Sequence, residues 1–401
     1  MSNAFNKISS FVSLNEAWKN LWNSSRPKSR ETSGVDGESL NDFSINSVAN
    51  LQSISRSLRK GTYTLSGLKP HFIIKPNGKI RVICVPCTRD RIVQGALLKF
   101  LSDKYTARFS NEVSYGFLKN RDVKKALLVA QSKRKKNPWV FKTDIKAFFD
   151  NIQRTDLKNK IRTIIKERSL HLILEAIVSS EIVISSNTEK RKLAQLEIKN
   201  GVGVRQGMPL SPFFSNIVLE RFDRAATSAG YSALRYADDL IFFSASKVFC
   251  AEIESFCAKE LKKVDLDIPP SGKPDSKTII YSPKEDAEFL GLSISPEGAG
   301  YIIKVSSNQI AKILETFNHL SNVKELLARK LTIGRLGTYL KARKSGYINA
   351  YDLCSNIADL ENQLEGVEQT ILKKLYQNEL HINLSTISSE AYTFLGLRNK
   401  S

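Results

Sequence analysis

Three aspartates stand beside apolar, strand-like runs, and their type and spacing make them the strongest candidates for chemistry. Asp144 follows WVFKT, while Asp238 and Asp239 lie between ALRY and LIFF. Carboxylates in such settings are partly desolvated, and three that converge without positive charge raise one another's pKa. Divalent cations remove that penalty, and two Mg²⁺ ions about 3.5–4 Å apart can serve both sides of an in-line displacement at phosphorus. The pattern indicates a phosphoryl-transfer site, although each acid alone could be a structural turn or a helix cap.

The charge balance indicates a polyanionic partner. The 401 residues include 61 Lys and Arg against 40 Asp and Glu, a formal net charge of +21. Nucleic acid fits this excess better than an anionic membrane surface, because the basic residues are dispersed and not gathered on one amphipathic helix. No run approaches the roughly 18 apolar residues of a membrane span, and the N-terminus lacks the build of a signal peptide. We therefore expect a cytoplasmic protein whose five scattered cysteines are reduced and structural.

Periodicity and turn residues predict the elements that must position the aspartates. Two strands are expected around a Pro-Asn-Gly turn in 71–85, and a strand in 139–149 runs into Asp144. The basic run 131–138 indicates a solvated loop, and 187–201 a charged hairpin or an insertion. The alternation of elements predicts an α+β fold, a mixed sheet with packed helices followed by a helical C-terminal domain. The remaining predictions are helices at 91–105, 155–180, 210–230 and 247–263, a β-rich connector at 281–305, and basic helices beyond about 306.

Seven blocks of the sequence, in order, resemble those of the reverse transcriptase family. RYADDLIFF (235–243) is similar to the family's Tyr-x-Asp-Asp hairpin, and FKTDIKAFFDNI (141–152) to its first catalytic motif. The match runs over roughly residues 33–292 and looks most like bacterial enzymes of the group II intron and retron-like class, especially stand-alone, defence-associated ones. The other similar blocks are SGVDG (33–37), IIKPNGKIRVICVPCTRDRIVQGAL (73–97), SYGFLKNRDVKKAL (114–127), GVRQGMPLSPFFSNIVLERFD (203–223) and KTIIYSPKEDAEFLGL (277–292).

This resemblance implies a right-hand polymerase with fingers, a palm built on a mixed or antiparallel sheet, and a helical thumb. No H-N-H-like endonuclease, RNase H acid set or Asn-Ala-x-x-His retron element is found in the sequence. The regions implied are an N-terminal extension at 1–60, fingers at 61–139, a palm at 140–292 with a fingers-side helical insertion at about 153–202, and a thumb at 293–401.

The resemblance also implies how the acidic residues act. Asp144, Asp238 and Asp239 would hold two Mg²⁺ ions, or Mn²⁺, with the backbone carbonyl of Ile145 as a further ligand. Lys277 falls where the family has a lysine that acts as general acid for the leaving pyrophosphate. These five positions form the catalytic and metal-binding set implied by the resemblance.

A second implied set binds the incoming nucleotide. Arg81 suits bidentate phosphate contact and Lys75 adds a point charge, although both could be generic surface cations. Phe149 falls where the family has an aromatic gate against the ribose 2′-hydroxyl, and plain core packing is its alternative. The nucleotide-binding residues implied are Lys75, Arg81, Ile145, Phe148, Phe149 and Gln206.

A third implied set contacts nucleic acid. A thumb that grips a template–primer duplex needs backbone contacts without base readout, and Lys and Arg supply them, although a solvated helix face is the alternative. The residues are Tyr236 in the hairpin, Phe289, Leu290 and Gly291 in the primer grip, and Arg329, Lys330, Arg335, Lys341, Arg343 and Lys344 in the thumb.

The expected function is RNA-directed DNA polymerisation. Its partners would be an RNA template, a DNA product strand and dNTPs, and the expected setting is antiviral defence with a dedicated noncoding RNA. No membrane partner is expected, and a homo-oligomer or a partner protein stays open. The alternatives are an RNA-directed RNA polymerase, which Phe149 argues against, a template-independent or protein-primed DNA polymerase, a group II intron-type enzyme in retrohoming, and a non-catalytic RNA-binding scaffold.

Overall fold

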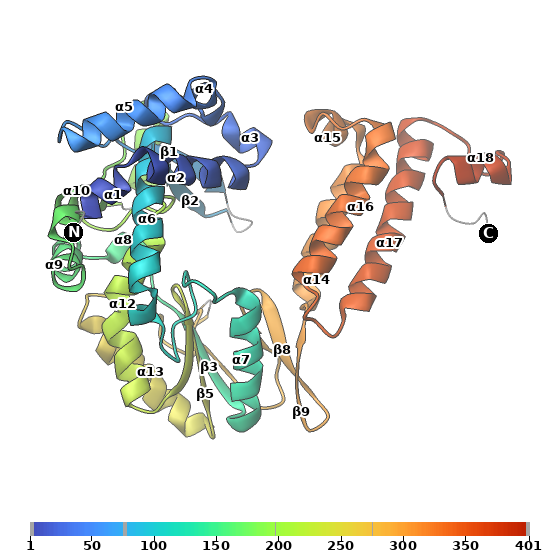
Figure 1. Ribbon diagram of the computed structural model, residues 1–401. Helices are drawn as coiled ribbons and strands as arrows, with labels where there is room; N and C mark the ends of the chain where they lie inside the picture. Colours follow the sequence, from blue (N-terminus) through green and yellow to red (C-terminus); the bar gives the residue numbers. More distant parts are fainter. Residues whose placement is uncertain (1–3, 75–77, 197, 275, 398–401) are drawn as a thin grey trace. The chain divides into compact units, whose positions relative to one another are not determined.

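Figure 1 shows the computed structural model, which describes residues 4–74, 78–196, 198–274 and 276–397. The chain divides into two compact units, Met1–Ala126 with Phe141–Ile280 and Leu127–Val140 with Tyr281–Ser401. Each unit combines helices with antiparallel strands, so the predicted α+β class is confirmed. The boundaries of the N-terminal extension, fingers, palm and thumb stay a prediction.

The first unit is mostly helical, and helix α7 begins in it. Amphipathic patterns explain several of them; α5, for example, buries Leu51, Ile54 and Leu58 on one face. The helices are α1 (Ala4–Ile8), α2 (Phe11–Ser24), α3 (Pro27–Arg30), α4 (Leu40–Ile45), α5 (Ser47–Arg59), α6 (Thr88–Phe109), α7 (Val123–Lys136), α8 (Phe148–Asn151), α9 (Arg154–Ile164), η1 (Arg168–Leu170), α10 (His171–Val178), α11 (Asn187–Gln195), α12 (Ser211–Ser228) and α13 (Lys247–Lys262).

Two sheets position the candidate site. Strands β1 (Lys69–Ile74) and β2 (Ile80–Val85) form the predicted antiparallel ribbon. A four-stranded sheet has the order β4-β5-β3-β6, so the strand that ends at Asp144 neighbours the strand that begins at Asp239. Its strands are β4 (Ser232–Tyr236), β5 (Asp239–Ser244), β3 (Trp139–Asp144) and β6 (Ile279–Tyr281).

The core beneath this sheet is aromatic and aliphatic. Phe141 of β3 and Phe242 of β5 meet edge to face, with ring centroids 6.2 Å apart. Helix α12 is buried along most of its length, as the apolar pattern of 210–230 predicts, and it ends before Gly230, whose φ is +72°. Phe222 on α12 and Phe256 on α13 pack together, which ties both helices to the sheet through Phe242.

The expected basic loop at 131–138 is wrong, because α7 continues to Lys136. Arg134 in this run is fully buried in the second unit and donates to the carbonyls of Ser282 (2.9 Å), Glu285 (2.6 Å) and Ile294. Its guanidinium also lies over the Tyr301 ring, 4.4 Å from the centroid. Carbonyl dipoles and an aromatic face thus stabilise the buried charge of Arg134. The run of like charges in the sequence did not indicate that one of them is buried.

The charged segment 187–201 begins with a helix and is not a hairpin. Ser186 is the N-cap of α11, and its hydroxyl accepts a hydrogen bond from the Glu189 amide at 3.2 Å. Leu193 provides the buried anchor of this helix.

The second unit contains most of helix α7, and its C-terminal segment forms a three-stranded antiparallel sheet followed by helices (Figure 1). Leucines from neighbouring helices, among them Leu336, Leu340 and Leu364, form its core. Among the described residues, no helix has both the length and the apolar character that a membrane crossing requires. The elements are β7 (Ala287–Phe289), β8 (Leu292–Glu297), β9 (Gly300–Lys304), α14 (Ser307–Asn318), η2 (His319–Ser321), α15 (Val323–Ala328), α16 (Ile333–Ala350), α17 (Ile357–Lys374), the π-helical turn η3 (Leu375–Glu379) and α18 (Ser389–Phe394).

Candidate active site

The paired aspartates lie at a tight turn between two buried strands. Tyr236 and Asp239 form the last pair of the β4–β5 hairpin, so Ala237 and Asp238 make a two-residue loop. Ala237 has a φ of +58°, a left-handed conformation that a non-glycine residue adopts only when its surroundings enforce it. The sequence prediction of a hairpin at this point agrees with the structure.

Asp144 lies beside this turn because β3 and β5 are neighbours. The amide of Ile145 donates to the carbonyl of Asp238 at 3.1 Å, which fixes the end of β3 against the hairpin loop. The Asp144 carboxylate forms an ion pair with Lys277, whose side chain is 70% exposed against 15% for Asp144. The structure therefore brings Asp144, Asp238 and Lys277, which are far apart in sequence, to one place.

Burial sets the electrostatics of the hairpin. Desolvation raises the pKa of Asp238, and the charges of Arg81 and Arg235 oppose that rise. Desolvation likewise raises the pKa of Asp239, which the neighbouring charge of Asp238 raises further and Lys142 lowers. These directions are the ones expected for carboxylates set between apolar strands.

A cavity of about 410 Å³ opens at these residues. This volume lies within the range of ligand sites. Lys75, by contrast, lies outside the described residues, and Asp239 is not among the residues that line the cavity. The predicted residues that share its wall are Arg81, Asp144, Ile145, Phe148, Phe149, Gln206, Asp238 and Lys277.

Three chain segments are joined at this wall by backbone hydrogen bonds. The amide of Cys84 in β2 donates to the Gln206 carbonyl at 2.7 Å, and the amide of Val204 donates to the Phe149 carbonyl at 2.7 Å. Across the join, the Arg81 Nε donates to the Gln206 Oε1 at 2.9 Å. A cationic side chain, an amide and an aromatic ring are thus held at fixed relative positions.

A glycine allows the segment that carries Gln206 to lie this close to β2. Gly207 has a φ of +107°, and a Cβ there would lie 2.6 Å from the Cys84 carbonyl oxygen. Any side chain at this position would push the Gln206 segment away from β2.

Sequence reasoning missed a buried ion pair that supports the hairpin. Arg235 is fully buried on β4, and its guanidinium donates to both carboxylate oxygens of Asp223 on α12, at 2.6 and 2.5 Å. It also donates to the carbonyl of Ala237 at 3.1 Å, to the Ser114 hydroxyl at 2.8 Å and to the Asn216 side-chain oxygen at 3.2 Å. A charged residue inside the apolar strand ALRYADD was the available signal, since buried charges are paired.

Further missed residues line the cavity itself. Asp150 comes directly after Phe149 on α8, and Leu196 and Ile198 follow helix α11. The end of the charged segment therefore forms part of the cavity wall, for which its composition gave no signal.

Metal binding is supported by the kind of donor present. Within the part of the chain that the structure describes, no three His, Cys, Asp or Glu side chains are gathered closely enough to hold a metal ion. Asp144 and Asp238 nevertheless line one cavity, and hard carboxylate oxygens are the ligands that Mg²⁺ prefers. A cation would also relieve the desolvation that raises the pKa of Asp238. The donor set therefore fits Mg²⁺ in chemistry.

The predicted primer-grip residues lie in the second unit. Phe289 is buried and pairs with Leu292, so Leu290 (φ +52°) and Gly291 (φ +82°) form a two-residue hairpin turn. Only the turn itself is left at the surface for a contact with nucleic acid.

The predicted thumb cations differ in how far they are engaged. Arg343 lies among aromatic rings and donates to the hydroxyls of Tyr339 (3.1 Å) and Tyr347 (3.3 Å). Lys344 pairs with Glu365 at 2.9 Å and Arg329 with Glu325 at 3.4 Å. The exposed residues are Arg329, Lys330, Arg335 and Lys341.

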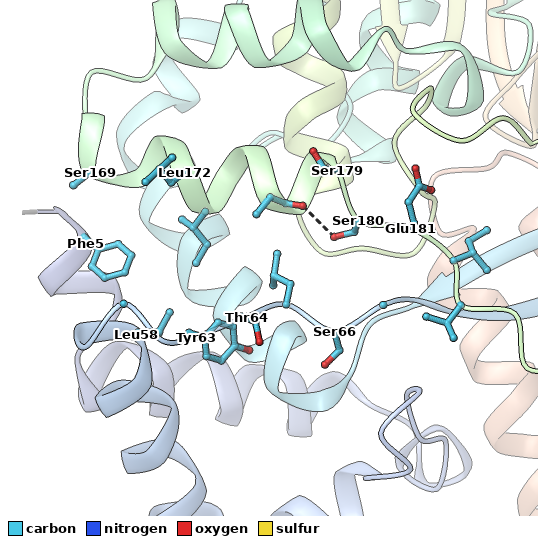
Figure 2. A pocket seen from close by; sticks show the side chains of 17 residues that line it. Phe5, Leu58, Tyr63, Thr64, Ser66, Ser169, Leu172, Ser179, Ser180 and Glu181 are labelled. Atoms are coloured by element: carbon cyan, nitrogen blue, oxygen red, sulfur yellow. Dashed lines mark hydrogen bonds between the residues drawn. The ribbon is translucent and has the colours of Figure 1, made fainter.

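A larger cavity, of about 850 Å³, lies elsewhere in the first unit (Figure 2). Its walls are mostly apolar and come from 58–67, α10 and 179–183. Glu181 is the charged residue among the described residues that line it, and Arg154 (2.5 Å) and Arg205 (2.9 Å) bind its carboxylate. Ser180 donates to the Ala176 carbonyl at 3.4 Å. Among the described residues, the larger cavity therefore lacks the several charged side chains that line the smaller one, and the smaller one is the candidate site.

Several known proteins are similar in sequence to about half of this chain. Protein YkfC of Escherichia coli K12 is 29% identical over 203 residues, 49% of this chain and 50% of that protein. Group II intron-encoded protein LtrA of Lactococcus lactis is 27% identical over 209 residues, 52% of this chain and 32% of LtrA. The retron Ec73 reverse transcriptase of E. coli is 30% identical over 185 residues, 42% of this chain and 51% of that enzyme. The chain thus spans about half the length, or less, of these relatives.

A family model gives the assignment. The model described as reverse transcriptase (RNA-dependent DNA polymerase) matches residues 73–294, more than half of the chain. That range includes both aspartate motifs, Arg81, Gln206 and Lys277, so the predicted resemblance is confirmed. The chain belongs to the reverse transcriptase family.

Proposed function

We propose that this protein is an RNA-directed DNA polymerase that extends a primer on an RNA template. The observation that carries the proposal is one cavity lined by Asp144, Asp238, Lys277, Arg81 and Gln206. Carboxylates at one end and a guanidinium at the other suit a nucleoside triphosphate, whose α-phosphate reacts while its outer phosphates need cationic partners. Membership of the reverse transcriptase family supports this reaction class.

The chain's own residues would position the nucleotide. Arg81 would contact the outer phosphates, and Gln206, which accepts a hydrogen bond from Arg81, would hold the nucleotide beside it. Phe149 lines the same cavity next to Phe148, with ring centroids 5.0 Å apart, and would exclude a 2′-hydroxyl. Fixed positioning of this kind supplies most of the catalysis in phosphoryl transfer.

The proposed reaction joins the primer 3′-oxygen to the α-phosphorus and releases pyrophosphate. Asp144, Asp238 and Asp239, with the Ile145 carbonyl, would hold Mg²⁺ or Mn²⁺, which when bound would acidify the primer hydroxyl and neutralise the leaving charge. Lys277 would give its Nζ proton to the pyrophosphate. Its ion pair with Asp144 keeps that Nζ at the carboxylate end of the cavity.

The template would be RNA, and Arg335 and Lys341 on α16 offer exposed cations for the duplex backbone. Primer extension on matched RNA and DNA templates tests this choice. We expect dNTP-dependent extension on RNA. DNA synthesis with no added template, or product attached to a protein side chain, would contradict the proposal and favour the template-independent or protein-primed alternative.

The biological setting is proposed as antiviral defence directed by a dedicated noncoding RNA. Similarity to the retron Ec73 and Mx65 reverse transcriptases is compatible with a dedicated template, and similarity to LtrA is compatible with retrohoming. Sequencing of the RNA and cDNA that copurify with the protein distinguishes these settings. One discrete RNA and its cDNA are expected; random cellular RNA without discrete cDNA would refute a dedicated template.

A further inference from the structure

One carboxylate in the nucleotide cavity has no role in the proposed reaction. Asp150 lies on α8, directly after Phe149, and lines the cavity together with Arg81 and Gln206. Within the described part of the chain, the structure gives its carboxylate no hydrogen bond and no ion pair. Asp150 is partly buried at the cavity wall, so a ligand that fills the cavity would displace the water around its carboxylate, which would then need a donor from that ligand.

The charges around Asp150 sharpen the problem. Burial raises the pKa of Asp150, and Arg205 and Arg81 oppose that rise. Arg205 is only 2% exposed, and its Nε and Nη1 are buried without hydrogen-bond partners. Its Nη2 is engaged by Glu181 and by the Lys199 carbonyl, both at 2.9 Å. The positive charge of Arg205 therefore stabilises the ionised form of Asp150, although the cavity is proposed to accept a polyanion.

The chemistry of a deoxynucleoside triphosphate limits what can satisfy this carboxylate. Its phosphate oxygens are acceptors, and in thymidine triphosphate, the nucleotide of the test below, the single base N–H donor is used in pairing with the template. The sugar 3′-hydroxyl is the donor that remains. Because Phe149 and Asp150 both line this cavity, a sugar placed against the Phe149 ring can present this hydroxyl to Asp150.

We infer that Asp150 accepts a hydrogen bond from the 3′-hydroxyl of the incoming deoxynucleotide, an inference that rests on the proposed function. Asp150 is then a specificity residue, which ties nucleotide binding to the hydroxyl that the next round of extension needs. Loss of one hydrogen bond to a charged acceptor should weaken binding of a nucleotide that lacks the 3′-hydroxyl on the order of 10- to 100-fold.

The test compares dTTP with 2′,3′-dideoxythymidine triphosphate. The protein is assembled with an oligo(A) RNA template and a primer that ends in a dideoxynucleotide, so that no bond can form. The measured quantity is the nucleotide concentration at which half of the complex of protein, template and primer is protected from dissociation in the presence of Mg²⁺. Incorporation of the two nucleotides is then measured with an ordinary primer.

We expect the wild-type protein to prefer dTTP and Asp150→Ala to lose most of that preference. Asp150→Asn should be intermediate, because an amide oxygen still accepts, and it provides a second variant if the alanine protein does not fold. Asn151→Ala is the matched control; its side chain lies on the same turn, is exposed and donates to the Lys146 carbonyl at 3.1 Å, away from the cavity wall. It should keep the wild-type ratio.

Each contrary outcome is decisive. An unchanged ratio in both Asp150 variants, or an equal loss for both nucleotides, would overturn the inference, since the second result would assign Asp150 to the alignment of Arg81. Absence of any preference in the wild-type protein would overturn it too. A preference that Asp150→Ala abolishes, without extension of an ordinary primer, would uphold the inference and refute the proposed polymerase activity.

Discussion

The buried ion pair between Arg235 and Asp223 should control the stability of the hairpin that carries the paired aspartates. Asp223→Asn removes the carboxylate charge and leaves the guanidinium buried, because Arg235 is fully buried and Asp223 only 1% exposed. Loss of one partner of a buried pair costs about 3–5 kcal/mol. The Ser114, Asn216 and Ala237 oxygens still accept from Arg235, so we expect the lower end, about 3 kcal/mol.

Urea denaturation followed by circular dichroism measures this change. Glu112→Gln is the matched control, because Glu112 is exposed and directly precedes the Val113 carbonyl that accepts from the Arg235 amide at 2.7 Å. It should leave the free energy of unfolding unchanged. A fall of about 3 kcal/mol is a large part of the roughly 5–15 kcal/mol by which a folded domain is stable, and the Asp223→Asn protein should still be folded at low temperature.

The same variant should also raise the Mg²⁺ concentration needed for half-maximal extension, because the Ala237 carbonyl held by Arg235 precedes Asp238. An Asp223→Asn protein within about 0.5 kcal/mol of wild type, the range of ordinary surface substitutions, would refute the reasoning. It would mean that the three neutral oxygens hold Arg235 without the carboxylate.

Three further predictions follow from the geometry. Phe149→Val should raise ribonucleotide incorporation relative to deoxynucleotides, measured in single-nucleotide extension; an unchanged ratio would assign Phe149 to packing alone. Gly116→Ala should abolish extension and lower the melting temperature, because its Cβ would lie 2.4 Å from the backbone nitrogen of Ala237; wild-type extension would contradict this. Asp90, whose pKa burial raises to about 6, binds its proton more tightly in the folded protein, so its contribution to stability falls as the pH rises from about 4 to 6. Relative to Asp90→Asn, the wild-type protein should lose about 2 kcal/mol of unfolding free energy between these limits, and a pH-independent difference would contradict it.

The apolar runs around Asp238 and Asp239 were enough to predict a hairpin with desolvated carboxylates, because strand burial follows from local pattern. The contact between Arg81 and Gln206 was beyond such reasoning, since it joins residues 125 positions apart through a ribbon and a loop, and only the family resemblance indicated both. Arg235 could have been found, because a charge inside an apolar strand requires a buried partner. Its partner Asp223 is separated from it by the end of a helix and a turn, which local pattern does not place.

Leu196, Ile198 and the buried Arg134 show a second reason why the sequence could not predict every position. Both belong to charged runs that local composition assigns to solvent, and tertiary contacts decide otherwise. Leu196 and Ile198 reach the cavity because α11 packs as a helix, and Arg134 is buried because backbone carbonyls of a later sheet surround it. Sequence pattern describes a segment's own preferences, and these positions depend on distant partners.

Primer extension by Asp144→Asn and Asp238→Asn proteins tests the central claim most directly. Each change keeps the shape of the side chain and removes the negative charge at the carboxylate end of the cavity. We predict that both variants fold, still bind a primer annealed to RNA, and lose extension by a factor on the order of 100 to 1,000, as expected when one key electrostatic group is removed. Wild-type extension by either folded variant would contradict the account, because the reaction would then not depend on the carboxylates around which the site is built.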